Sequence, residues 1–353
     1  VLESRAALGI ANSGRYPQLQ QATGAIAYVN TQSSSGSDQS LGSYEVGLNA
    51  GWELDFWGRY SRSIESADAA FFSSVFNQQN GQVLLTAQVA DLYYAYRTIL
   101  LRIDIARKNA RIQKRSYEIT EALFKSGASA ELDLQQAKTQ YMATLSSIPG
   151  LEIALRQFHN NLCVLLGRPP GSLPELDNEV RSLPVVNRAA LEEVPAQLLM
   201  RRPDIRAAAS QVASQSAQVG VAETELYPSI SLFGNLGWSG STPSDSANTL
   251  SLGIGPSFTW NLFDHGRIKN NVRIQDARLQ QAIESFQNSV LLAARELDDA
   301  AISVIKTREQ QSPQRESTLA AERSLELANT RYREGYADFQ RVIDAQRAAA
   351  GQA

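Results

Sequence analysis

Alternation of apolar and polar side chains marks two stretches of the chain. From Leu250 to Leu262 apolar residues and one proline take the even positions, and Ser, Gly, Thr and Asn take the odd ones. The stretch from Tyr44 to Phe56 alternates in a similar way. A period of two over about 10 residues predicts a β-strand with one apolar and one polar face. A less regular stretch precedes each of them, so two β-hairpins are expected, at 17–57 and 228–264.

These strands have two interpretations. A soluble antiparallel sheet would place its apolar face on a core, with exposed Ser/Gly/Asp-rich loops near 31–40 and 239–248. Strands of about 10 residues also suit a bilayer crossing, and aromatic residues gather where the strands end, as at a membrane interface. Four strands cannot close a membrane barrel, because the smallest have about 8. Several chains would therefore share one barrel. The aromatic residues expected at the membrane–water interface are Trp52, Phe56, Trp57, Trp260 and Phe263.

Two long stretches follow the hairpins and carry a helical pattern. Residues 59–126 contain no proline and only one glycine, Gly81, and residues 267–334 repeat this pattern with an irregularity expected at Pro313. Apolar residues recur at helical spacing among Gln, Ser, Lys, Arg and Glu, which predicts amphipathic helices. At about 1.5 Å per residue each helix would reach roughly 100 Å. Helices of this length are expected to pair as in a coiled coil.

Glycines end both long helices and shorter helices follow. Gly127 and Gly335 occupy the position after a helix C-terminus, where a left-handed backbone favours glycine. Return helices are expected at 130–166, interrupted at Pro149-Gly150, and at 337–353. The proline-rich segment 167–202 is expected to be an irregular crossover. A helix at 203–226 should begin with Pro203 in its first turn, fixed by Arg202 and Asp204.

The chain also repeats itself. Residues 52–137 are echoed 208 positions later without a gap, which indicates two copies of one large unit. The first repeat would span 1–166 and the second 203–353. Because each repeat lacks a piece that the other has, the chain is expected to be a fragment, with any export signal or N-terminal anchor upstream. Matching pairs include Trp52 and Trp260, Gly58 and Gly266, Arg59 and Arg267, Asp91 and Asp299, and Gly127 and Gly335.

Composition narrows the function classes. The hydrophobic content of 43% is sufficient for a core, and the net charge of −3 gives no indication of a nucleic-acid partner. A single cysteine, Cys163, cannot form an internal disulfide, and His159 and His265 are too isolated for a histidine-based metal site. No apolar run reaches the length of a transmembrane helix. No phosphate loop, nucleophile elbow or other catalytic motif is present, so neither an enzyme nor a cofactor is expected.

Several motifs, in order along nearly the whole chain, resemble the TolC-like outer-membrane efflux proteins (the outer membrane factors). The Arg-Arg-Pro-Asp and Trp-Glu-Leu-Asp versions are most similar to the branch that serves RND-type drug efflux, the OprM-type channel proteins. The motifs are Trp52-Glu53-Leu54-Asp55-Phe56-Trp57-Gly58-Arg59, Leu165-Leu166-Gly167, Arg201-Arg202-Pro203-Asp204, Tyr227-Pro228-Ser229-Ile230, Trp260-Asn261-Leu262-Phe263-Asp264-His265-Gly266-Arg267 and Asp344-Ala345-Gln346-Arg347.

The resemblance implies a membrane α+β fold and a homotrimer. Three chains would each give four strands to a 12-stranded transmembrane β-barrel in the outer-membrane lipid, continued by a long periplasmic α-helical barrel. The helix ends would bind a periplasmic adaptor (a membrane fusion protein) that couples the channel to an inner-membrane RND transporter. The channel would then be a passive exit duct for drugs and small toxic compounds. Many members are lipoproteins, anchored through an N-terminal cysteine that would lie outside this chain.

The resemblance also places functional residues at the second helix turn. A periplasmic gate is expected there, at Asp344, Asp338, Arg331 and Tyr332, because symmetry makes each carboxylate a ring that narrows the pore. The same charges could instead be solvated helix-surface groups. Gln340 stands where this branch often has an apolar plug residue. Adaptor contacts are expected at the turn residues Ser126, Gly127, Ala128, Glu334, Gly335 and Tyr336.

The favoured function is therefore the outer-membrane channel of a tripartite efflux pump. A type I secretion channel for proteins or a metal-ion efflux channel would use the same fold for another cargo. A soluble coiled-coil scaffold or binding protein is the alternative from a different class. It would lack a lipid-facing surface and would not need detergent to assemble.

Overall fold

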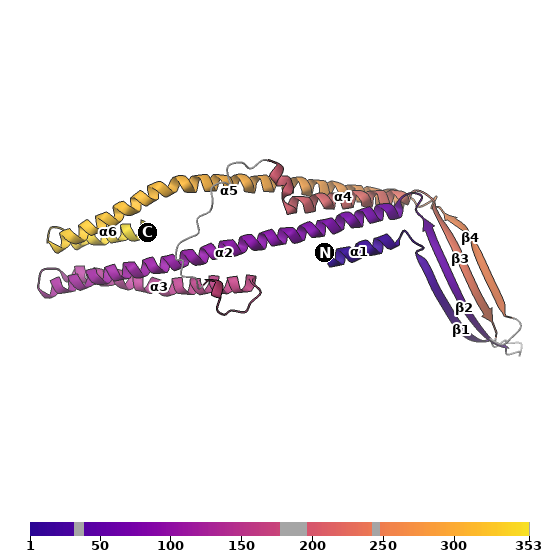
Figure 1. Ribbon diagram of the computed structural model, residues 1–353, viewed down its shortest axis with the longest axis horizontal. Helices are drawn as coiled ribbons and strands as arrows, with labels where there is room; N and C mark the ends of the chain where they lie inside the picture. The colour runs from indigo at the N-terminus through magenta and orange to yellow at the C-terminus, as the bar shows by residue number, and fades with distance from the viewer. Residues whose placement is uncertain (32–38, 177–195, 242–247, 353) are drawn as a thin grey trace. The chain divides into compact units, whose positions relative to one another are not determined.

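The computed structural model describes residues 1–31, 39–176, 196–241 and 248–352. Most of both expected hairpin loops and much of the expected crossover thus lie outside the described residues. Figure 1 shows the elements, which are in chain order α1 (Leu2–Ser13), β1 (Leu19–Thr31), β2 (Gln39–Leu54), α2 (Arg59–Lys125), α3 (Glu131–Leu165), η1 (Pro174–Leu176), η3 (Ala196–Arg201), α4 (Pro203–Thr224), β3 (Ser229–Gly240), β4 (Thr249–Thr259), α5 (Arg267–Arg333) and α6 (Phe339–Gln352).

The chain divides into two compact units that cut across the two sequence repeats. Unit 1 comprises residues 1–80 and 195–294, and unit 2 comprises residues 81–194 and 295–353. Each repeat therefore contributes its hairpin to unit 1 and its helix turn to unit 2. The helices α2 and α5, of 67 residues each, belong to both units.

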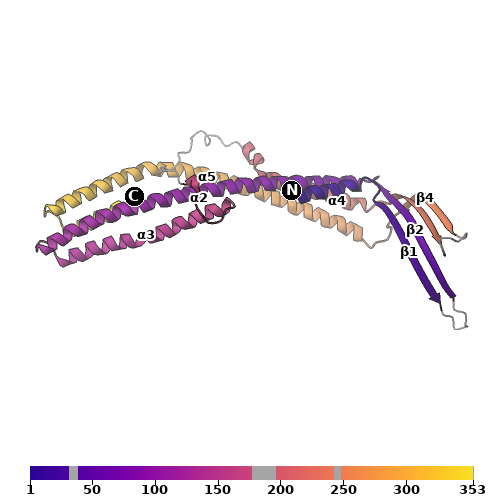
Figure 2. The same cartoon turned by 60° about the horizontal axis from the view of Figure 1, so that its bottom comes forward.

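Four antiparallel strands form one sheet in the order β1-β2-β3-β4, as Figures 1 and 2 show. The central pairing of β2 with β3 joins the two repeats. Residues paired across strands share a face of the sheet. One such row contains Leu48, Leu236 and Leu252, and the next contains Asn49, Asn235 and Gly253. The predicted division into an apolar and a polar face is confirmed.

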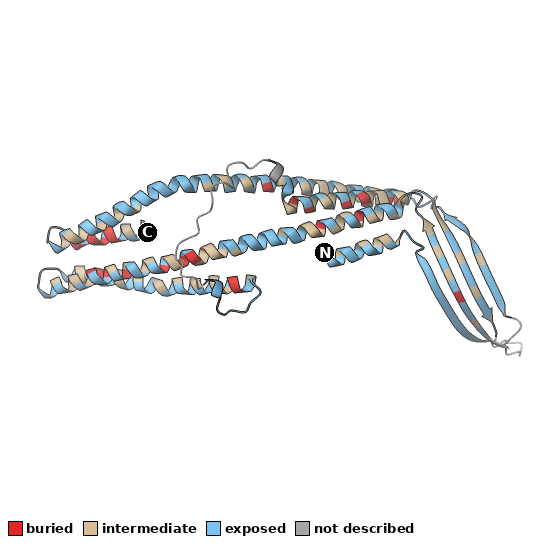
Figure 3. Cartoon of the chain, viewed as in Figure 1, coloured by how far each residue is buried: buried red, intermediate tan, exposed pale blue. Residues whose placement is uncertain are grey.

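The described residues leave the apolar face of this sheet uncovered. Ile26, Leu252 and Ile254 are 91%, 78% and 86% exposed. Among the strand residues whose exposure is described, only Gly47 is buried, which Figure 3 shows as the single red position in the sheet. Strands β1 and β4 are its two edges. The expectation of a soluble sheet packed on its own core is not met within the described residues.

In unit 1, α4 packs against the start of α2 through small polar side chains. The hydroxyls of Ser66 and Ser214 lie 3.0 Å apart and are buried. Ser73 donates a hydrogen bond of 3.1 Å to the carbonyl oxygen of Ala207. Buried hydroxyls that are hydrogen-bonded let two helices approach closely without an unsatisfied polar group. Helix α4 begins at Pro203, as the sequence predicts.

Unit 2 has a small core at the turn between α5 and α6. Phe339, Val342 and Ile343 of α6 pack with Ala137 of α3, and Tyr117 of α2 lies against this cluster. Gln346 of α6 donates a buried hydrogen bond of 2.8 Å to the Ser116 hydroxyl of α2. The residues that hold α6 in place thus come from α2, α3 and α5.

The expected interruption of α3 at Pro149-Gly150 is wrong, because α3 continues from Glu131 to Leu165. A proline inside a helix removes one N–H donor and leaves the carbonyl four residues earlier without its partner. The freed carbonyl belongs to Leu145, which is exposed, so water can bind it. Helix α5 likewise continues through Pro313, which is also exposed.

Candidate functional site

The turn between α2 and α3 has a defined backbone geometry. Gly127 adopts a left-handed conformation with φ of 76°. Its N–H donates to the carbonyl of Phe124 at 2.9 Å, and the N–H of Ala128 donates to the carbonyl of Leu123 at 2.8 Å. This pair of bonds is the Schellman motif, which caps a helix C-terminus and requires the conformation that glycine adopts freely.

The turn between α5 and α6 has the same geometry at the matching position. Gly335 has φ of 79°, and Tyr336 N–H donates to the carbonyl of Arg331 at 2.9 Å. Both turns lie at the same end of unit 2 in Figures 1 and 2. The expected adaptor contacts therefore gather at one end of this unit, and all of them are exposed: Ser126, Gly127, Ala128, Glu334, Gly335 and Tyr336.

The residues predicted to form a gate lie beside this second turn. Asp344 is exposed and accepts a hydrogen bond of 3.0 Å from the Gln340 amide. Arg331 and Asp338 are also exposed, and within the described part of the chain no ion pair joins Arg331 to either aspartate. The single chain therefore leaves Arg331 and Asp338 available to another molecule. Their role as a gate stays a prediction.

Tyr332 differs from the other three because it is half-buried. Its ring lies 5.1 Å from that of Phe339, and it packs against the core of unit 2. Its hydroxyl is buried without a hydrogen-bond partner, as is the side-chain oxygen of Gln113 in α2. The sequence pattern did not single out Gln113, or the Ser116–Gln346 pair, because buried polar residues look like surface residues in a helical repeat.

Two of the predicted interface aromatics are fixed by hydrogen bonds in unit 1. The Trp57 indole donates to the carbonyl of Pro228 at 2.8 Å and stacks on Tyr227 at 4.7 Å. The Trp260 indole donates to the carbonyl of Leu226 at 3.2 Å. Both tryptophan side chains therefore form a hydrogen bond with the connection between α4 and β3. The other three predicted interface aromatics are exposed: Trp52, Phe56 and Phe263.

Aspartates begin both long helices, a feature that the sequence analysis missed. Asp264 accepts hydrogen bonds from the N–H groups of Gly266 and Ile268, at 3.0 and 2.7 Å. Asp55 accepts bonds of 2.9 Å from the N–H groups of Tyr60 and Ser61. These bonds satisfy N–H groups that have no partner inside a helix. The sequence feature that could have indicated these hydrogen bonds is an aspartate three or four residues before each arginine that begins a long helix.

The carboxyl of Asp55 is acidic for this reason. Partial burial raises its pKa, but hydrogen bonds from the Ser61 hydroxyl and the N–H groups of Tyr60 and Ser61 outweigh that effect. The pKa of Asp55 therefore lies below its ordinary value of 3.8. Its contribution to stability is complete above that value and is lost as the pH falls through the lower pKa of the folded state.

We expect Asp55→Ala to lower the free energy of unfolding by about 1 kcal/mol, as loss of a helix N-cap usually does. Urea unfolding in detergent, followed by circular dichroism, measures the change at neutral pH. Asp68→Ala is the matched control. Asp68 is exposed on α2, the helix that begins at the Asp55 hydrogen bonds, and it forms no hydrogen bond within the described residues. The difference between the variants should shrink in acid. An equal loss in both would contradict the capping role.

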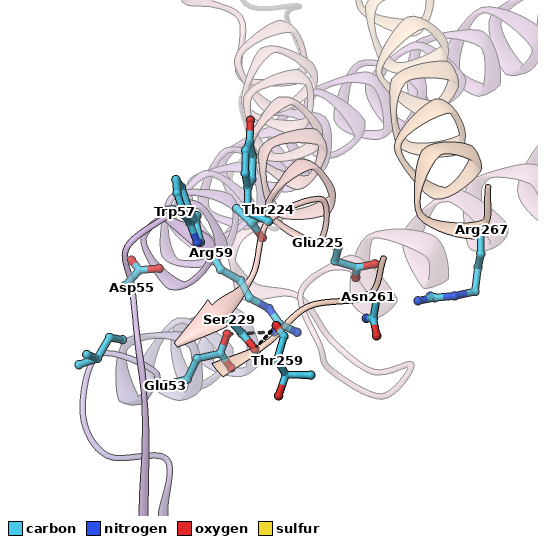
Figure 4. A pocket seen from close by; sticks show the side chains of 12 residues that line it. Glu53, Asp55, Trp57, Arg59, Thr224, Glu225, Ser229, Thr259, Asn261 and Arg267 are labelled. Carbon is cyan, nitrogen blue, oxygen red and sulfur yellow. Dashed lines mark hydrogen bonds and ion pairs between the residues drawn. The ribbon is translucent and has the colours of Figure 1, made fainter. Parts of the chain in front are cut away.

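A hollow of about 270 Å³ lies where the strands of unit 1 meet its helices, as Figure 4 shows. Three chain connections line it: the turn from β2 to α2, the turn from α4 to β3, and the turn from β4 to α5. Its charged lining residues are Glu53, Asp55, Arg59, Glu225 and Arg267. No group of three or more metal-ligating side chains occurs among the residues that the structure describes.

No helix in the described ranges is both long and apolar enough to cross a membrane.

Comparisons with known proteins agree on one family. The family model described as "Outer membrane efflux protein" matches residues 1–168 and 194–353. Nodulation protein T of Rhizobium leguminosarum bv. viciae is 29% identical over 88% of this chain, which spans 64% of that protein. Cation efflux system protein CusC of Escherichia coli K12 is 28% identical over 98% of this chain and 75% of its own. The solved outer-membrane channel OprN matches with a TM-score of 0.92 and 33% identity, over 99% of this chain and 79% of that chain.

Proposed function

Because this chain belongs to the outer membrane efflux protein family, we propose that it is one subunit of a passive outer-membrane exit duct. The fold is the TolC-like fold, and the family consists of channels and not of enzymes. The observation that carries the proposal is the sheet of unit 1. Its apolar face is uncovered and its two edge strands, β1 and β4, have no neighbour in the described chain.

A lipid environment accounts for both features of the sheet. Apolar side chains on one face are stable against acyl chains, and the polar face is stable against water inside a barrel. Open strand edges are not tolerated in lipid, because unpaired N–H and C=O groups lose their hydrogen bonds to water. Pairing β1 of one subunit with β4 of the next satisfies both edges. Three subunits with four strands each would give the 12-stranded barrel.

The helix turns of unit 2 support a docking role for this unit. Both turns are rigidly capped, exposed and alike in backbone geometry. A periplasmic adaptor would bind the six exposed turn residues, and the inner-membrane transporter would act through the adaptor or at the turns themselves. The duct itself supplies no energy. Its gate at Asp344, Asp338, Arg331 and Tyr332 would open when these partners bind.

The proposed cargo is drugs and other small toxic compounds. The Arg-Arg-Pro-Asp start of α4 supports the RND-type drug-efflux branch. Metal-ion efflux is the second candidate, favoured by the similarity to a protein named for cation efflux. A type I secretion channel has the same fold but no feature of this chain in its favour. A lipid anchor on an N-terminal cysteine would fit the outer-membrane location.

The first test is the molar mass of the protein purified from membranes, by light scattering with correction for bound detergent. We expect a trimer that needs detergent and that conducts ions in planar lipid bilayers. A monomer that stays soluble without detergent and does not conduct would contradict the proposal. Such a result would favour a coiled-coil binding protein.

A further inference from the structure

The hollow where the strands of unit 1 meet its helices contains charged groups that have no assigned role. It lies wholly in unit 1, and the turns that line it are far apart in sequence, at 53–59, 224–229 and 259–267. Bonds across these turns hold them together. The Trp57 indole binds the carbonyl of Pro228, and Ser229 donates to the carbonyl of Thr259 at 3.4 Å.

Part of the charge in the hollow is already neutralised. Arg59 forms an ion pair of 3.3 Å with Glu53, and the Tyr60 hydroxyl donates to the other Glu53 oxygen at 3.0 Å. Asp55 accepts the hydrogen bonds that begin α2. These three charged residues maintain the local structure and are not free to bind a solute.

The other charged lining groups form no ion pair in the described part of the chain, although Arg267 lies near enough to Asp264 to lower the pKa of its carboxyl. Within the described ranges, Arg267 and Glu225 form no ion pair and Asn261 forms no side-chain hydrogen bond. Glu225, Asn261 and Arg267 line the same hollow, and in the view of Figure 4 the Arg267 guanidinium points toward the other two side chains. Glu225 is half-buried, whereas Asn261 and Arg267 are exposed. A donor group and an acceptor group therefore line one hollow without satisfying each other.

Strand register places three of the residues that line the hollow on one face of the sheet. Glu53 pairs with Ser231, and Ser229 pairs with Thr259. Successive residues of a strand alternate between faces, so Glu53, Ser229 and Thr259 lie on the same face as Asn49, Asn235 and Gly253. This is the polar face of the sheet. In the proposed channel the apolar face meets lipid, so these three lining residues face the lumen.

We propose that this hollow is a transit site for charged solutes, in which Arg267 and Asn261 contact carboxylates and other anions while Glu225 contacts cations. The inference rests on the proposed channel function. Threefold symmetry would place three such sites at one level of the lumen. A conducting pathway needs sites that bind weakly enough to release the solute. Exposed, water-accessible groups meet that requirement better than a buried and fully satisfied pair would.

The test is the ratio of chloride to potassium permeability, from the reversal potential of trimers in planar bilayers under a potassium chloride gradient. A unit charge at about 8 Å in water changes the local concentration of a monovalent ion about two-fold. We therefore expect Arg267→Gln to lower the ratio by about two-fold or more, and Glu225→Gln to raise it by a similar factor. Arg267→Lys should leave the ratio close to that of the unchanged protein.

Lys269→Gln is the matched control for the loss of one positive charge. Lys269 is two residues further along α5 and does not line the hollow. A shift as large as that of Arg267→Gln would overturn the assignment, because any nearby charge would then suffice. Conducting trimers whose ratio does not change in Arg267→Gln or Glu225→Gln would overturn the inference and leave the channel function standing. Failure of the unchanged protein to conduct would overturn both.

Discussion

Replacing Ile254 with arginine should prevent the protein from assembling in the membrane. Ile254 lies in the middle of β4, is 86% exposed and pairs with Gly234 on the apolar face. An arginine facing lipid near the bilayer midplane costs about 2–4 kcal/mol, and a trimer would carry three of them. We expect the variant to be lost from the trimer fraction of detergent-solubilised membranes, measured by light scattering and by the amount of protein in the membrane.

Ser251→Arg is the matched control for this substitution. Ser251 lies three residues earlier on the same strand and pairs with Gly237 on the polar face. An arginine there would face water in the lumen, so trimers should form normally. Ile254→Ala tests whether loss of the isoleucine alone matters. Equal amounts of trimer in Ile254→Arg and Ser251→Arg would show that the apolar face does not meet lipid, and the channel interpretation would fail.

The two faces of the sheet could be predicted from the sequence because apolar and polar residues alternate along each strand. Leu250, Leu252 and Ile254 alternate with Ser251 and Gly253 whether the apolar face meets a protein core or lipid. The pattern therefore predicted the strands and their two faces but not what covers the apolar face. Only the exposure of these side chains in the folded chain distinguishes the two cases.

The helix turns were also predictable, whereas the continuity of α3 was not. Gly127 and Gly335 mark the turns because few other residues adopt a positive φ without strain. Pro149 and Gly150 are also residue types that commonly end a helix, yet α3 continues through them at exposed positions. The cost of one lost hydrogen bond depends on whether water can replace it, and exposure is not visible in the sequence.

The hollow where the strands of unit 1 meet its helices also could not be predicted from the sequence, but for a different reason. It depends on contacts between distant segments, such as the Trp57 indole and the carbonyl of Pro228, 171 positions apart. The repeat did indicate that Arg59 and Arg267 occupy matching positions, each at the start of a long helix. It did not indicate that Arg59 forms an ion pair with Glu53, whereas Arg267 forms none among the described residues.

The gate predicted at the second helix turn depends on contacts between neighbouring subunits. Arg331 and Asp338 are exposed and unpaired within the described chain, and Asp344 accepts a bond only from Gln340 in the same helix. Long charged side chains without partners are ordinary on a helix surface. The same side chains form a ring when a threefold axis brings three copies together. Conductance measurements distinguish these two interpretations.

Replacing both Arg331 and Asp344 with alanine should hold the channel open if these residues close it. A hydrogen bond to a charged group contributes about 1.5–3 kcal/mol, and symmetry would remove three sets of them. A change of about 1.4 kcal/mol is already ten-fold in an equilibrium. We therefore expect the open probability in planar bilayers to rise about ten-fold or more, since the closed form loses its stabilising contacts.

The double variant Arg323→Ala and Glu326→Ala is the matched control for this change. It removes one positive and one negative charge from the same helix as Arg331, and these two residues already pair with each other on the surface of α5. Its open probability should equal that of the unchanged trimer. An unchanged open probability in the Arg331 and Asp344 double variant would remove both residues from the gate. The closed form would then depend on the buried contacts of α6, where Gln346 binds Ser116 and Phe339 packs on Tyr332.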